Sequence, residues 1–306
     1  MSPEGLITSE FDDAAIIDTE VDPAALVAVD ADDPYALDTA ALDPDELTDL
    51  ELVVLGLTGT TVADDGLVEQ AFLRALDAAG LAVTDDELRR AQEFAHAAMG
   101  RPRIAVFQAL TDDEDRAEHA NAVFESAYAE LAADQGVRPV PGAEDLIRRL
   151  RSLGVAVVLT TAFSRATLDT VLDALGWRDL PDLALSPSDG GRGRPYPDLP
   201  LTALLRTGAA SVEGMVVVGD TASDIASGLA AGAGLVVGVL TGAHDEETLL
   251  DAGADAVIAG VADLAELLGL DELDERDELD RADHRGDDVE KAAVRAAGQP
   301  ERQTLR

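Results

Sequence analysis

The sequence predicts an α/β protein built on a doubly wound parallel β-sheet. Short apolar runs rich in valine alternate with helix-like segments from about residue 51 onward. This alternation is typical of a parallel sheet covered by helices on both faces. In addition, Gly, Thr or Asp directly follows several of the apolar runs, at the sheet edge where open α/β sheets bind ligands.

The expected strands are the apolar runs at 52–55, 155–159, 215–218 and 235–239, with a weaker one at 255–258. The helices expected between them are at 142–153, 164–175, 198–206, 222–232, 245–252 and 261–268. These two sets alternate along the chain, so each strand has a helix to return the chain to the same edge of the sheet.

A helical insertion is expected between the first strand and the rest of the sheet. Residues 66–138 show no convincing strand, and candidate helices lie at 66–80, 85–99, 102–110 and 113–134. An all-helical insertion after the first strand predicts a cap, or lid, over the strand ends. The predicted α/β core is therefore residues 50–65 and 139–270, with residues 66–138 as the cap.

The two ends of the chain differ from this core. Residues 1–49 contain acids but no lysine or arginine, and three short phrases there begin with Asp-Pro, at positions 22, 33 and 43. Asp followed by Pro suits the start of a helical turn. The composition favours a disordered extension, and a docking segment for a protein partner is the alternative. Residues 271–306 form a charged tail, either helical or disordered.

Composition excludes several classes of partner. The formal net charge is −40, and Lys291 is the only lysine, so a nucleic acid or an anionic membrane is not an expected partner. There is no cysteine, and hence no disulfide or thiolate zinc site. No apolar stretch reaches the roughly 18 residues of a membrane helix, and the acidic N-terminus is unlike a secretory signal. We therefore expect a soluble, cytoplasmic protein.

Two junctions between a predicted strand and the following loop indicate where a functional site lies. Residues 52–55 lead into Gly56-Leu57-Thr58-Gly59-Thr60-Thr61, a loop shaped for phosphate but without an acid. Residues 215–219 lead into Asp220-Thr221-Ala222-Ser223-Asp224, which places two carboxylates four residues apart. Such a pair suits Mg²⁺, which favours few carboxylates together with waters and substrate oxygens. Capping of the following helix is the alternative explanation for these acids.

Four short sequence motifs indicate a family for this predicted α/β fold. They are Gly-Thr-Thr-Val at 59–62, Asp-Gly-Leu-Val-Glu at 65–69, Leu-Thr-Thr-Ala-Phe-Ser-Arg at 159–165 and Gly-Arg-Pro at 193–195. With these phrases in this order, the chain resembles the haloacid dehalogenase superfamily, and within it the phosphonatase-like branch. The resemblance covers roughly residues 50–270. It implies a Rossmannoid core with a helical cap inserted after the first strand.

The resemblance also implies where catalytic groups should stand, and this chain departs from it. The family's attacking aspartate falls at Gly56, which cannot attack phosphorus. The second family acid falls at Thr58, where the phosphonatase branch often has a small residue. The lysine with which phosphonatases form an imine falls at Arg103, and a guanidinium stays protonated and forms no such imine. Phosphonoacetaldehyde hydrolysis is therefore not expected.

Other family positions are kept. The hydroxyl that holds a phosphoryl oxygen corresponds to Thr161, with Thr160 as the neighbouring alternative, and the basic residue corresponds to Arg194. Asp220 and Asp224 match the Mg²⁺-binding acids, Asp220 nearer the ion and Asp224 orienting the arginine or a metal-bound water. Loss of an acid at Gly56 should weaken the ion's affinity. The alternatives are a threonine that merely ends a strand and an arginine in a surface loop.

No other residue is expected to replace the nucleophile. Asp64 and Asp65 lie eight and nine residues beyond Gly56, where we expect the chain to have left the sheet edge. The histidines show no metal-ligand spacing, and we interpret them as surface or packing residues: His96, His119, His244 and His284.

Two functions follow from these positions. The first is a non-catalytic or very weak homologue that binds a phosphorylated ligand or a protein partner. The second is an active phosphatase for a small phosphorylated metabolite, in which Mg²⁺-activated water attacks without a covalent intermediate.

Overall fold

A computed structural model describes residues 50–270 of the chain. The expectations for residues 1–49 and 271–306 lie outside the described residues. Among the helices of residues 50–270, none combines the length and the apolar character needed to cross a membrane.

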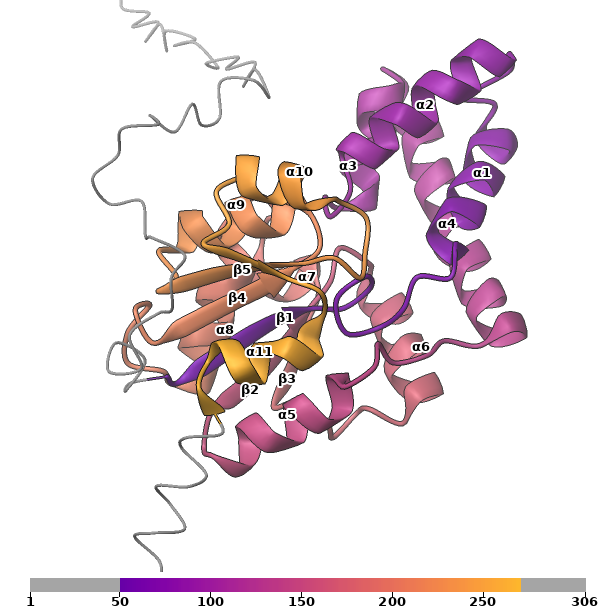
Figure 1. The fold of residues 1–306 in the computed structure, drawn as a ribbon. Helices are drawn as coiled ribbons and strands as arrows, with labels where there is room; N and C mark the ends of the chain where they lie inside the picture. Colours follow the sequence, from indigo (N-terminus) through magenta and orange to yellow (C-terminus); the bar gives the residue numbers. More distant parts are fainter. Residues whose placement is uncertain (1–49, 271–306) are drawn as a thin grey trace, which may run out of the picture. The chain divides into compact units, whose positions relative to one another are not determined.

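The core is one sheet of six parallel strands in the order β3-β2-β1-β4-β5-β6 (Figure 1). The strands are β1 (Leu52–Gly56), β2 (Ala156–Thr160), β3 (Leu183–Leu185), β4 (Met215–Gly219), β5 (Leu235–Val239) and β6 (Ala256–Ile258). The order reverses between β1 and β4, which makes the sheet doubly wound and places a ligand crevice at that edge. The predicted fold class is confirmed.

All five predicted strands are present, each displaced by no more than one residue at either end. Strand β3 was not predicted; it has only three residues, Leu183–Leu185. A run that short carries no usable periodicity, and it forms a strand because it pairs with residues 158–160 of β2.

Both faces of the sheet are buried, which explains why its strands are continuous apolar runs. Val53 and Leu55 of β1 pack in one cluster with Ile147 of α5 (Ala143–Ser152), whereas Val54 packs in another with Leu199 of α8 (Asp198–Thr207). Successive side chains of a strand point to opposite faces. The side chains of β1 therefore pack in two hydrophobic clusters, one on each face of the sheet.

Helices cover these two faces in the predicted places. The helices of the core are α5 and α8, together with α6 (Arg165–Leu175), α7 (Pro187–Gly190), α9 (Ala222–Ala231), α10 (Glu246–Asp251) and α11 (Leu264–Leu267), which follows a 3₁₀ turn at Val261–Asp263. Figure 1 shows α5 and α11 on one face and α9 and α10 on the other. Only α7, a single turn, was not predicted.

Four helices and no strand occupy residues 66–138, as predicted: α1 (Leu67–Ala79), α2 (Asp85–Ala97), α3 (Arg103–Leu110) and α4 (Glu114–Gln135). We call this segment the helical insertion. Aromatic rings hold it together: Phe72 of α1 stacks on Phe107 of α3 at 5.5 Å, and Phe107 meets Phe124 of α4 at 6.2 Å.

Helix α4 contacts the sheet edge and the start of α6. The ring of Phe163, just after β2, lies 4.5 Å from the ring of Tyr128 in α4. The Glu125 carboxylate, also in α4, accepts hydrogen bonds from the Ser164 amide (3.1 Å) and hydroxyl (2.7 Å), and from the Thr167 hydroxyl. Glu125 thereby caps the first turn of α6 and holds α4 at the sheet edge.

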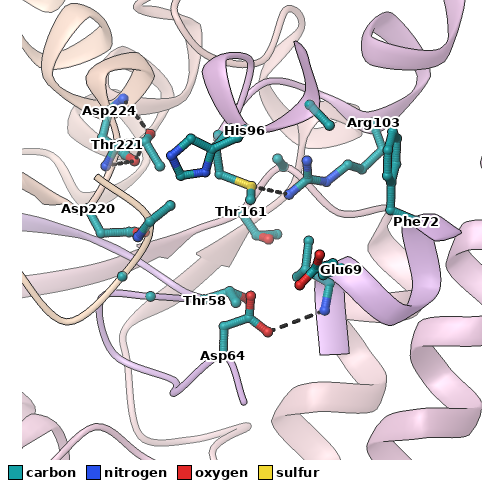
Figure 2. Close-up of a pocket in the computed structure, with 18 of the residues that line it drawn as sticks. Thr58, Asp64, Glu69, Phe72, His96, Arg103, Thr161, Asp220, Thr221 and Asp224 are labelled. Carbon is teal, nitrogen blue, oxygen red and sulfur yellow. Dashed lines mark hydrogen bonds between the residues drawn. The ribbon is translucent and has the colours of Figure 1, made fainter. Parts of the chain in front are cut away.

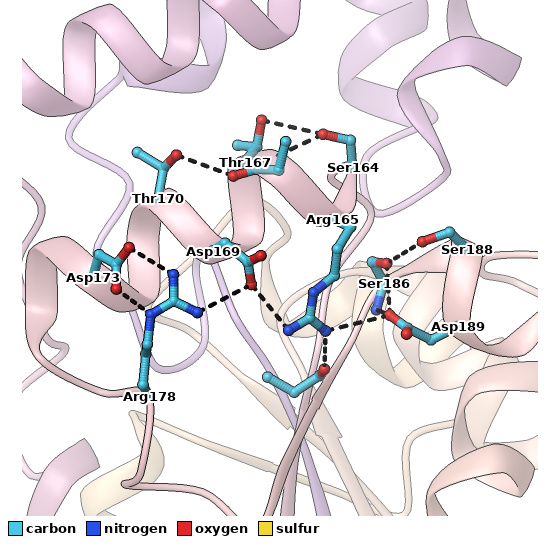
Figure 3. Close-up of polar contacts among 12 residues, drawn as sticks. Ser164, Arg165, Thr167, Asp169, Thr170, Asp173, Arg178, Ser186, Ser188 and Asp189 are labelled. Atoms are coloured by element: carbon cyan, nitrogen blue, oxygen red, sulfur yellow. Dashed lines mark hydrogen bonds and ion pairs between the residues drawn. The ribbon is translucent and has the colours of Figure 1, made fainter.

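Helix α6 is also tied to the loop after β3 (Figure 3). Arg165 contacts Asp169 at 2.9 Å on its own helix and Asp189 of α7 at 3.5 Å. Asp189 in turn accepts from the Ser186 amide and hydroxyl. These charges are partly exposed, so each pair contributes little to stability, but together they fix the loop that leads toward Arg194.

Candidate functional site

A cavity of about 540 Å³ lies where the loops after β1, β2 and β4 meet the helical insertion. The loops contribute Thr58, Gly59, Thr161, Ala162, Phe163, Asp220, Thr221 and Asp224, and the insertion contributes mainly Val68, Glu69, Phe72, Gln92, Glu93, His96, Met99 and Arg103. Figure 2 shows these side chains converging from the two sides. The predicted site residues that line this cavity are Thr58, Arg103, Thr161, Arg194, Asp220 and Asp224, whereas Gly56 and Thr160 do not line it. The cavity also has an apolar wall.

Asp220 lies at the end of β4 and is almost fully buried. Its carboxylate accepts hydrogen bonds from the Thr60 hydroxyl (2.9 Å) and the Ala243 amide (3.0 Å). Burial raises the pKa of Asp220 to about 7, and the negative charge of Asp224 adds to the rise. The backbone at Gly59, whose φ is +85°, approaches the carboxylate too closely for a side chain.

Asp224 has the two roles that the sequence left open. Together with Thr221 it forms a capping box at the start of α9, and its second carboxylate oxygen lies 2.7 Å from Nε of Arg194. Both side chains of this ion pair are buried. Arg194 also donates through Nη2 to the Thr160 hydroxyl (2.6 Å) and carbonyl (3.0 Å). The pair thus locks Arg194 at the ends of β2 and β4.

The structure distinguishes the two neighbouring threonines. The Thr160 hydroxyl is occupied by Arg194, and Thr160 does not line the cavity. Thr161 does line it, and within the described part of the chain its hydroxyl makes one hydrogen bond, which it accepts from the Phe163 amide at 3.2 Å. The Thr161 hydroxyl keeps its proton for a ligand, which makes it the better placed of the two.

Gly56 ends β1, directly opposite Thr160 in the sheet. A β-carbon at Gly56 would lie 2.5 Å from Oγ1 of Thr60. The Thr60 side chain is fully buried, and it donates to Asp220. The hydroxyl of Thr60 therefore fills the space that a side chain at residue 56 would enter.

Asp64 is a cavity residue that the sequence analysis did not expect. Its side chain lines the cavity beside Thr58, and it accepts a hydrogen bond from the Val68 amide at the start of α1 (3.3 Å) (Figure 2). Burial raises its pKa. The expectation that the chain has left the site by this point is wrong for Asp64. Asp65 instead pairs with Arg138 at the surface, at 2.6 Å.

The helical insertion contributes Arg103, which is only 6% exposed. Its Nη2 lies 3.1 Å from the sulfur of Met99, and its guanidinium carbon lies 5.4 Å from the centre of the Phe124 ring. Burial lowers the pKa of Arg103 to about 10, so the group remains a cation at neutral pH.

Two histidines lie between the insertion and the core. His244 is buried; its Nδ1 accepts from the Ala222 amide (2.9 Å), and its Nε2 lies 3.2 Å from the His96 carbonyl. His244 thus packs as expected, whereas His96 also lines the cavity. Within residues 50–270 no three His, Cys, Asp or Glu side chains are grouped to hold a metal ion.

Comparison with known proteins agrees with this geometry. The family model for haloacid dehalogenase-like hydrolases matches residues 50–232, more than half of the chain. The chain belongs to this family. The resemblance inferred from the four phrases is confirmed, including its phosphonatase-like branch.

Relatives of this haloacid dehalogenase-like chain include a phosphonoacetaldehyde hydrolase of Bacillus cereus, 30% identical over 209 residues, which are 64% of this chain and 78% of that protein. Among solved structures, a hydrolase from Pseudomonas syringae has a TM-score of 0.62 at 25% identity and covers 74% of this chain and 98% of its own. A phosphonoacetaldehyde hydrolase-like protein from Oleispira antarctica, with a TM-score of 0.63 at 23% identity, covers 72% and 92% and shares the fold.

The haloacid dehalogenase-like hydrolases generally use Mg²⁺, an ion that binds oxygen donors. Asp220 offers a carboxylate, but Asp224 is paired with Arg194 and Gly56 offers no side chain. Mg²⁺ requires a near-octahedral set of oxygens. Asp220 is therefore the predicted metal-binding acid that remains unpaired with a cation, and no group of three acidic or histidine side chains lies around it within residues 50–270.

Proposed function

We propose that this member of the haloacid dehalogenase-like hydrolases binds a small phosphorylated or phosphonylated ligand and turns it over very slowly or not at all. The observation that carries the proposal is the packing at the end of β1. Gly56 has no nucleophile, and the Thr60 hydroxyl fills the space where one would begin.

Three groups support the binding half of the proposal. Arg194 uses Nε and Nη2 within the protein, and its Nη1 makes no hydrogen bond within residues 50–270. The Thr161 hydroxyl faces the cavity with its proton unused. The buried Thr58 hydroxyl makes no hydrogen bond of standard geometry within residues 50–270; its polar neighbour is the Tyr128 hydroxyl, whose pKa is raised by burial and lowered in part by Thr58. Donors of this kind suit the oxygens of a phosphoryl group.

The size of the catalytic loss follows from the role of the missing group. Removing the member of a catalytic unit that forms the covalent bond costs on the order of 10⁶ in kcat, and the rest of the site retains about 10³–10⁴ over water. Hydrolysis by Mg²⁺-activated water is the alternative, because it needs no acid at Gly56. It does need a second strong carboxylate ligand, and the ion pair of Asp224 with Arg194 removes the best candidate.

The name of the Bacillus cereus relative does not carry over as an activity. An imine mechanism needs an amine in the cavity wall, and Arg103 occupies that side of the cavity. A guanidinium has no lone pair free for such chemistry. We therefore do not propose phosphonoacetaldehyde hydrolysis for this chain.

A phosphatase assay with Mg²⁺ on sugar phosphates and aryl phosphates tests the proposal. The wild type should release phosphate at a rate near background, and Gly56→Asp should release it faster. Gly56→Asn is the matched control, since it has the same size and no nucleophile. Turnover of the wild type at an ordinary enzyme rate, about 1–10³ s⁻¹, would establish the alternative function.

A further inference from the structure

Arg103 is a buried cation without a counterion. Within residues 50–270 it forms no ion pair, its Nε has no hydrogen-bond partner, and its single protein acceptor is the Met99 sulfur. A thioether is a weak acceptor. Burying a charge without a hydrogen-bonded partner is strongly unfavourable. The buried guanidinium of Arg103 therefore does not stabilise the fold, which points to a role in binding.

The acids near Arg103 are already engaged elsewhere. Asp64, Glu125 and Asp220 each act on Arg103 at longer range. Asp64, however, binds the first turn of α1, and Glu125 binds the first turn of α6. Asp220 accepts from the loop after β1. None of the three comes within ion-pair distance of the guanidinium, so among residues 50–270 this cation has no carboxylate of its own.

The guanidinium also faces the cavity. In Figure 2 the Arg103 side chain extends toward the centre of the drawn residues, and Asp220 and Asp224 lie on the opposite side of that centre. Its surroundings include the rings of Phe72 and Phe124 and the side chain of Met99. The Phe124 ring offsets part of the charge. In apolar surroundings of this kind, a charge-assisted hydrogen bond is stronger than in water.

We propose that Arg103 binds a second anionic group, a carboxylate or a comparable oxyanion, at the end of the ligand opposite its phosphoryl group. The ligand class is then a small molecule with a phosphate or phosphonate at one end and an acid at the other. The planar fork of arginine can hold such an acid through two parallel hydrogen bonds. This inference depends on the proposed function only for the binding of the phosphoryl end of the ligand.

The cavity has room for such a molecule. Its volume of about 540 Å³ falls within the roughly 300–1,000 Å³ of small-molecule sites. Arg194 and Thr161 lie on the side of the core and Arg103 lies on the side of the insertion, so a ligand held at both ends would contact both parts of the protein.

Calorimetric titration of the full chain tests the inference. The probes are phosphonoacetate, 3-phosphonopropionate and 4-phosphonobutyrate, each compared with an alkyl phosphonate of equal length that lacks the carboxylate. At least one carboxylated probe should bind on the order of 10- to 100-fold more tightly than the alkyl phosphonate that lacks the carboxylate, as expected for hydrogen bonds to a charged group. Arg103→Met should abolish that preference and leave the alkyl phosphonates unaffected.

Two further variants separate binding from folding. Arg101→Met is the matched control, because Arg101 lies two residues away and outside the cavity lining; it should keep the preference. In thermal unfolding without ligand, Arg103→Met should melt at the same temperature as the wild type or higher, since it removes an unpaired buried charge. A structural role for Arg103 predicts a lower melting temperature instead.

The outcomes distinguish the two proposals. If the alkyl phosphonates bind through Arg194 but no carboxylate adds affinity, the inference fails and the proposed function stands. If the preference survives in Arg103→Met, the inference fails as well. If no probe binds, both fail. Should Arg103→Met not fold, Arg103→Lys must weaken the preference, since a lysine cannot form the two parallel bonds.

Discussion

Nε of Arg194 lies 2.7 Å from a carboxylate oxygen of Asp224, and the two side chains are only 9% and 3% exposed. This pair joins the loop before α8 to the first turn of α9, and Thr160 at the end of β2 completes it. The same contact aims Arg194 into the cavity and holds two parts of the core together. Mutation of either residue should therefore affect folding as well as ligand binding.

Replacing Arg194 with methionine should lower the free energy of unfolding by about 3–5 kcal/mol, because it leaves the buried Asp224 charge uncompensated. Arg194→Met/Asp224→Asn should recover much of that loss, since asparagine carries no charge and keeps an oxygen that accepts from the Thr221 amide. Urea denaturation of the three chains measures both effects. Arg192→Met is the control: Arg192 pairs with Asp198 at the surface, and its loss should cost no more than about 1 kcal/mol.

The close approach of Thr60 to Gly56 predicts coupling between these positions. Gly56→Ala should destabilise the protein by about 1–3 kcal/mol, because its methyl group meets the Thr60 hydroxyl. In Gly56→Ala/Thr60→Ala the clash is relieved, so the double variant should lose less than the sum of the single ones, by about 0.5–3 kcal/mol. Additive losses in urea denaturation would show that Thr60 does not fill this space.

The main elements of the fold followed from the sequence because its strands are buried on both faces. Residues 215–218, for example, form an unbroken apolar run, and such a run needs no alternation to be recognised. The candidate residues Arg194, Asp220 and Asp224 could be placed near one another from the sequence because each lies beside a strand end or in a short family phrase. These signals are local in the sequence, so they can be recognised without knowledge of the tertiary structure.

Asp64 and Arg103 show what the sequence could not provide. Asp64 enters the cavity because the loop after β1 folds back on itself, with the Gly59 amide bonded to the Val62 carbonyl at 2.8 Å. No periodicity encodes that reversal. Arg103 could be placed in the insertion, but its lack of a counterion depends on how Asp64, Glu125 and Asp220 are each engaged. Those are tertiary contacts between distant segments.

The buried carboxyl of Asp64 predicts a pH dependence. Its folded pKa is raised above the ordinary value of 3.8 by burial, so the folded state holds this proton at pH values where the unfolded state has released it. Stability from this group is then full below about pH 3.8 and falls as the pH rises through the folded pKa. Chemical denaturation between pH 4 and pH 8 should show this fall.

Asp64→Asn provides the comparison for that measurement. Asparagine keeps the side-chain oxygen that accepts from Val68 but does not ionise. As the pH increases, the unfolding free energy of the wild type should fall relative to that of the variant. A difference that is constant with pH, or one that moves toward the wild type, would show that burial does not raise this pKa.

The incomplete set of carboxylates predicts a weak response to Mg²⁺. A ligand that binds only the folded state stabilises it by an amount that grows with its concentration relative to Kd, about 2.7 kcal/mol at 100 times Kd. Gly56→Asp adds a carboxylate at the end of β1, and its melting temperature should rise with millimolar MgCl₂ more than that of the wild type. Gly56→Asn controls for the side chain's size, and NaCl at matched ionic strength controls for screening. Equal shifts in the wild type and Gly56→Asp would mean that Asp220 and its neighbours already hold the ion, and metal-activated water would then become the better account of this site.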